Sequence, residues 1–241
     1  MEQCRQLSVL RWPQMYAERL AVVTMATHAD RRPPIAAVPA AVLSRRCHGS
    51  LDTITDSERR ALRPIGITAR EAAGRTGALL AGLFVLPGVR IFQGVRPAAG
   101  DVPLISHAVS AGHMLVLVES VAWPPGRYVT TAAGQVHCDG IYIGQSVWPL
   151  ITAVRHWQQA LPPGHRVHAL VVVHSIAAGD LELPVPDGPE LGWATACDAV
   201  RDLRAWLARG RRPTSATVIA VLAAATTGEQ AGDHEPPPCD R

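Results

Sequence analysis

An unbroken run of apolar residues in the second half of the chain constrains the fold more than any other feature. The segment 166–174 contains Ala-Leu-Val-Val-Val without interruption. Such a run is typical of a β-strand that is covered on both of its faces. The pattern therefore predicts a sheet with a layer of structure on each side.

Helix and strand patterns alternate around this strand. Thr68–Glu71 forms a capping box that opens an amphipathic helix, which ends before Pro87. A second helix is expected over 146–161, where apolar residues recur at helical spacing. The other expected elements are strands over 89–95, 104–110, 114–121, 128–131, 135–138 and 191–196, and helices over 198–209 and 215–225. This order predicts an α/β fold in which helices flank a mixed β-sheet.

Composition divides the chain into three regions. Residues 1–55 show weak periodicity interrupted by prolines, and we expect a weakly structured N-terminal extension. Residues 56–227 contain the periodic segments and are expected to form the α/β domain. Residues 228–241 are rich in proline and are expected to form a disordered tail.

Several features indicate a cytoplasmic protein with no membrane partner. The 5 cysteines are scattered and never form a Cys-x-x-Cys pair, which argues against a disulfide framework and for a reducing compartment. The start of the chain has no apolar core of a secretory signal. The apolar stretch 214–227 is shorter than the ~17–25 residues that span a bilayer. The net charge of +3 is too small to indicate a nucleic-acid partner by itself.

Lysine is absent, so all 23 basic residues of the Lys+Arg class are arginine. This excludes a Walker-type phosphate loop and Schiff-base catalysis, both of which require lysine. Asparagine is absent as well, and a GC-rich genome explains both gaps because the codons of both residues begin with two adenines. The chain also contains no Gly-x-Ser-x-Gly or Gly-x-Gly-x-x-Gly motif to indicate another class of α/β enzyme.

The segment from Asp101 to Gly126 carries a resemblance to a known family. A strand containing Ser106-His107 turns into an apolar strand that ends Glu-Ser-Val, followed by Trp123 and Gly126. This pattern resembles the nuclease-related domain family, a branch of the restriction-endonuclease-like PD-(D/E)xK fold, in which an Ile-Asp-His strand precedes a strand ending Glu-x-Lys, then a Trp and a Gly. The resemblance covers residues 68–208. It implies a restriction-endonuclease-like core.

The resemblance also implies a site in which carboxylates hold Mg²⁺ for the hydrolysis of DNA while a lysine orients the attacking water. Glu119 matches the metal-binding glutamate of the family. Ser106 stands where the family has aspartate, and Val121 stands where it has lysine. Gly77 lies where relatives often place a helical glutamate. The site is thus expected to be dismantled, and no cofactor is expected.

Three functions remain open, of which the third, an unrelated α/β enzyme, has no supporting motif. The first is a catalytically inactive nuclease-related protein that acts as a nucleic-acid-associated or protein-binding module. The second is a divergent endonuclease in which Glu119 and Asp101 hold Mg²⁺ or Mn²⁺ and His107 takes part in catalysis. The alternatives for single residues are a strand-end Glu119 that faces solvent or pairs with an arginine, and a turn role for Asp101.

Four residues are candidates for binding. Trp123, Arg127 and Tyr128 can form a recognition loop that stacks on bases or on a partner, and the alternative is a rigid strand exit whose Trp packs on the sheet. Gln145, before the long helix, is the fourth candidate.

A further set of side chains has the chemistry of zinc ligands. His107 and His113 are expected on one hairpin, with His137 and Cys138 close by in the sequence. Their spacing matches no closed zinc site, so the alternative is that they are ordinary core or surface residues.

Overall fold

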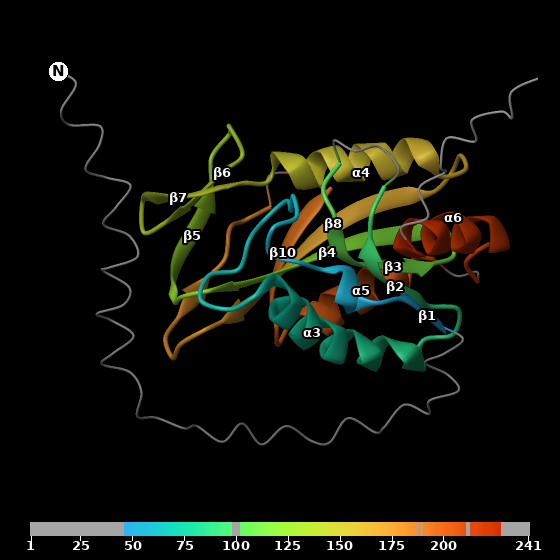
Figure 1. Cartoon of the computed structure of the whole chain (residues 1–241), viewed down its shortest axis with the longest axis horizontal. Helices are drawn as coiled ribbons and strands as arrows, with labels where there is room; N and C mark the ends of the chain where they lie inside the picture. The colour runs from blue at the N-terminus through green and yellow to red at the C-terminus, as the bar shows by residue number, and fades with distance from the viewer. Residues whose placement is uncertain (1–45, 98–101, 187, 189, 211–212, 228–241) are drawn as a thin grey trace, which may run out of the picture.

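A six-stranded mixed sheet forms the centre of the molecule (Figure 1). The computed structural model describes residues 46–97, 102–186, 188, 190–210 and 213–227. The sheet order is β1-β2-β3-β4-β8-β10, in which β2, β3 and β4 are antiparallel and β4, β8 and β10 are parallel. The strands are β1 (Cys47–Gly49), β2 (Arg90–Val95), β3 (Ile105–Ala111), β4 (Met114–Trp123), β8 (Arg166–Ser175) and β10 (Leu191–Thr195).

Helices cover both faces of this sheet, which confirms the predicted class of α/β protein with a mixed sheet. One face carries α3 (Ala69–Leu80), its continuation as the 3₁₀ helix η2 (Ala81–Val85), and α5 (Ala199–Leu207). The other carries α4 (Trp148–Ala160) and α6 (Ala216–Thr227). Figure 1 shows α3 and α4 on opposite sides of the sheet. None of the described helices is long and apolar enough to cross a bilayer.

The unbroken apolar run of the segment 166–174 lies in β8, in the interior of the sheet. Val171 and Val173 belong to the core under α4, while Leu170 and Val172 belong to the core under α3. Both faces of β8 are therefore covered, as the unbroken apolar run predicts.

A smaller sheet extends from one end of the central sheet. Its order is β7-β6-β5-β9. The strands are β5 (Gly126–Thr130), β6 (Gln135–Cys138), β7 (Ile141–Ser146) and β9 (Leu181–Glu182). The sequence did not predict β7, because none of its residues is buried and they lack an apolar alternation.

The described domain begins before residue 56, the predicted boundary. Residues 47–49 form β1, which pairs with β2 in parallel, and η1 (Leu51–Thr53) follows. The guanidinium group of Arg46 donates hydrogen bonds to the carbonyls of Phe84, Leu86 and Val89. The end of the expected extension is thus part of the sheet, and residues 1–45 and 228–241 lie outside the described residues.

Candidate active site: a buried arginine–serine–glutamate network

The two positions that the resemblance aligns with metal-binding carboxylates lie side by side. The register pairs His107 of β3 with Val118 of β4, which places Ser106 beside Glu119. Both side chains are fully buried, and the Ser106 hydroxyl donates to Glu119 Oε1 over 2.8 Å. Val121, two residues further along the same face of β4, is equally buried. The aligned positions therefore share one place in the fold, with one carboxylate among them.

Arg60 completes this group, and sequence reasoning missed it. Its Nη2 donates to Ser106 Oγ over 2.7 Å and also donates to Glu119 Oε1 in a buried ion pair. The whole residue is only 6% exposed. An arginine partner was one of the alternatives for Glu119, but no local pattern shows which arginine it is, because 59 residues separate the pair along the chain. The alternative of a solvent-facing Glu119 is wrong.

A short segment, residues 59–65, carries Arg60 to the sheet, and we call it the strap. At one end the Leu104 amide donates to the Arg59 carbonyl over 3.2 Å. At the other the Ile65 amide donates to the Ala122 carbonyl over 2.7 Å. The strap is thus fixed against β3 and β4 on both sides of Arg60.

Two predicted binding residues hold the strap between these ends. The Gln145 side chain accepts from the Arg63 amide over 2.8 Å and donates to the Arg63 carbonyl over 3.0 Å. The Trp123 indole N–H donates to the same carbonyl over 3.2 Å. In this structure Gln145 and Trp123 therefore position the backbone that presents Arg60.

The aromatic rings of the predicted recognition loop are buried. Trp123 and Tyr128 stack with ring centroids 4.7 Å apart, and the Tyr128 hydroxyl donates to the Pro124 carbonyl over 2.8 Å. Both rings therefore agree with the alternative interpretation of this segment, a rigid strand exit that packs on the sheet. Arg127 lies at the surface, where its guanidinium is 3.5 Å from the Glu182 carboxylate.

His107 lies on the opposite face of the sheet from Ser106 and Glu119, so it does not join them. Its ring faces α3, where a Cβ atom on Gly77 would come within 3.2 Å of Nε2. Burial, with a smaller effect of the Arg60 charge, lowers the pKa of His107 to about 3. Neither ring nitrogen has a hydrogen-bond partner among the described residues. The imidazole is therefore neutral near pH 7, and glycine at position 77 leaves it room.

A second buried polar pair lies on this α3 face and was also missed. Thr76 Oγ1 and His174 Nε2 are 2.8 Å apart, and both residues are buried. His174 directly follows the apolar run of β8. In the sequence it is the last residue of the predicted strand, and no pattern distinguishes it as a member of a polar pair.

The remaining metal candidates do not assemble. Asp101 lies outside the described residues. His113 is exposed in the β3–β4 turn, and His137 Nδ1 is 3.4 Å from the Gly140 carbonyl. Within the described part of the chain, no three His, Cys, Asp or Glu side chains are grouped so that they could hold a metal ion.

Within the part of the chain that the structure describes, the residues around Glu119 do not fit Mg²⁺ or Mn²⁺. These ions take about six oxygen ligands, usually including more than one carboxylate or phosphate. Glu119 supplies the only carboxylate of the network, and its Oε1 already accepts hydrogen bonds from Arg60 and Ser106. A metal ion there would also face the positive charge of Arg60. The arrangement is suited to holding β3, β4 and the strap together.

No protein-family model, curated protein or solved structure matches this chain.

Proposed function

We propose that this protein is a noncatalytic member of the nuclease-related group that acts as a binding module for nucleic acid or a protein partner. The order of elements supports the proposal. A helix (α3) precedes three antiparallel strands (β2 to β4), and a second helix (α4) leads to β8, parallel to β4. This agrees with the order on which the resemblance rests.

The observation that carries the proposal is the position of the Arg60 guanidinium. It binds both the carboxylate of Glu119 and the hydroxyl of Ser106, which is the place that a metal ion would need. Entry of a metal ion would require displacement of a buried arginine, and removing one partner of a buried ion pair costs about 3–5 kcal/mol. The protein's own cation thus replaces the catalytic one and stabilises the fold instead.

The strap also presents cations to solvent. Arg59 and Arg63 are exposed on either side of the buried Arg60. Arginine is well suited to bidentate contact with phosphate oxygens. These two side chains are the residues that we expect to contact a nucleic-acid backbone.

Purified protein incubated with plasmid and linear DNA in Mg²⁺ or Mn²⁺ tests the proposal. We expect no cleavage by the natural protein or by Glu119→Ala. Binding of DNA that weakens with salt and with Arg59→Ala/Arg63→Ala would assign nucleic acid as the partner. Absence of DNA binding would indicate that the partner is a protein. Cleavage that disappears in Glu119→Ala would overturn the proposal and favour the divergent endonuclease.

A further inference from the structure

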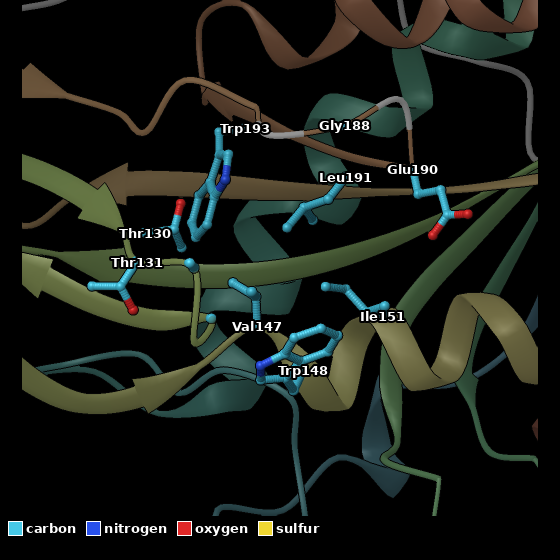
Figure 2. Close-up of a pocket in the computed structure, with 11 residues that line it drawn as sticks. Thr130, Thr131, Val147, Trp148, Ile151, Gly188, Glu190, Leu191 and Trp193 are labelled. Carbon is cyan, nitrogen blue, oxygen red and sulfur yellow. The ribbon is translucent and has the colours of Figure 1, made fainter.

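A half-open cavity of about 620 Å³ lies between the β5–β6 turn, the start of α4 and the residues that lead into β10 (Figure 2). Its volume falls within the ~300–1,000 Å³ range of sites for small organic ligands. None of its lining residues belongs to the Arg60–Ser106–Glu119 network. The cavity is therefore a separate site from the network on which the proposed function rests.

The first wall of the cavity is Trp148, an unusually exposed indole. It is 44% exposed, yet its orientation is fixed, because the ring N–H donates to the Ala133 carbonyl over 2.8 Å. Gly134 lies under the ring, and a Cβ atom there would come within 2.7 Å of it. Glycine at this turn allows the indole to lie flat against the backbone. Trp148 thus forms a fixed apolar wall of the cavity that remains open to solvent.

The second wall is Trp193, which projects into the cavity from β10 (Figure 2). Its ring packs behind against Trp123, with centroids 5.7 Å apart, and it is 9% exposed. Both indole rings are thus positioned before any ligand arrives, which lowers the entropic cost of binding. Val147, Ile151 and Leu191 supply the apolar surface between them.

The polar groups of the cavity are unevenly distributed. Figure 2 shows Glu190 at one side of the cavity and Thr130 and Thr131 at the other. Glu190 is exposed, and no ion pair to its carboxylate occurs within the described ranges. Among the described residues, the Arg155 guanidinium also carries a charge close by, outside the cavity lining at 5.9 Å from the centroid of the Trp148 ring. The described lining therefore offers aromatic walls and the carboxylate of Glu190.

We propose that this cavity binds a small planar aromatic amine. The flat ring system lies against the indole rings, since aromatic pairs in offset or edge-to-face arrangements attract each other. The protonated amine lies toward Glu190, at one side of the cavity, whose exposed carboxylate favours a cation. An aromatic acid of the same size meets the carboxylate with the wrong charge.

Isothermal titration calorimetry on the full chain tests this assignment with tryptamine, uncharged indole and indole-3-propionate. We expect tryptamine to bind about tenfold more tightly than indole-3-propionate, with indole between them. Glu190→Gln should weaken tryptamine about fivefold and bring the three affinities together, as expected for one partly solvated charge pair. Trp148→Ala should abolish binding of all three.

The matched control is Glu71→Gln, an exposed carboxylate on α3 at the opposite face of the sheet, which should leave all three affinities unchanged. Circular dichroism and thermal unfolding identify any variant that fails to fold. Because Glu190 is exposed, Glu190→Gln remains informative even if Trp148→Ala unfolds. Equal affinities for the amine and the acid would overturn the proposal. So would unchanged tryptamine affinity in folded Glu190→Gln, or no binding of any probe at millimolar concentration.

Discussion

The buried network on β3 and β4 and the cavity beside α4 use their polar groups in opposite ways. In the network, the carboxylate of Glu119 is engaged by Arg60 and Ser106 inside the protein. In the cavity, Glu190 is exposed, and the fixed indole of Trp148 remains open to solvent. A carboxylate at a candidate catalytic position is therefore not sufficient for catalysis. Its hydrogen-bond and ion-pair partners decide whether it is available to bind a metal ion or a ligand.

The difference also separates stability from binding. Charges in the network lie where water cannot solvate them, so each depends on its partner. Charges at the cavity are hydrated and contribute little to folding. Substitutions in the network should consequently change the folding stability, whereas substitutions at the cavity should change ligand binding.

The largest effect is expected for Arg60→Met. It leaves Glu119 buried without its cation, and we expect the free energy of unfolding to fall by about 3–5 kcal/mol in urea denaturation. Arg63→Met, on the exposed side of the same strap, should change it by less than about 0.5 kcal/mol. Replacing both partners, in Arg60→Met/Glu119→Leu, should recover most of the loss because no unpaired charge remains. A small loss in Arg60→Met would mean that the network is solvated and resembles the cavity.

The second effect concerns pH and His107. The unfolded imidazole has a pKa of about 6.5, whereas burial lowers the pKa in the folded protein to about 3. Between these values the unfolded state binds more protons, so the stability falls as the pH falls, by about 1.4 kcal/mol per unit. Relative to His107→Leu, the natural protein should lose about 2–3 kcal/mol more between pH 6.5 and 4.5. Parallel pH profiles of unfolding for the two proteins would show instead that the ring gains a proton without unfolding.

The third effect compares two glycines on α3. A Cβ atom on Gly74 meets nothing within 4 Å, whereas one on Gly77 comes within 3.2 Å of the His107 ring. Gly74→Ala should raise the free energy of unfolding by about 0.5–1 kcal/mol through helix propensity. Gly77→Ala should gain less or lose stability, because the close contact opposes the same propensity. Equal gains in thermal unfolding would show that the His107 side of the sheet has free space.

Sequence patterns predicted the central layers better than the contacts between distant segments. The apolar run in β8, the β3–β4 hairpin and the Thr68 cap are local signals, and each appears in the structure. Exposed β7 carried no apolar alternation and was missed. Burial of Arg60 depends on where the strap crosses the sheet, which no local period encodes.

The candidate site was predicted in part for the same reason. Glu119 and Ser106 lie on consecutive strands of one hairpin, so their proximity follows from the register. Asp101 belongs to residues that the structure does not describe, and His107 alternates with Ser106 and therefore points to the opposite face. The cavity joins three segments within the span from Thr130 to Trp193, and no sequence motif marked it.

The smallest effect on stability is expected for Glu190→Gln, and it gives the most direct comparison of the two regions. The same change at Glu119 would leave the Arg60 guanidinium buried without a counter-charge and belongs with the largest losses. At Glu190 the carboxylate is exposed, so the free energy of unfolding should change by less than about 0.5 kcal/mol. Urea denaturation of the two Glu→Gln variants side by side measures the contrast. Comparable losses would mean that Glu190 also has a buried structural partner, and the cavity would then not be a free binding site.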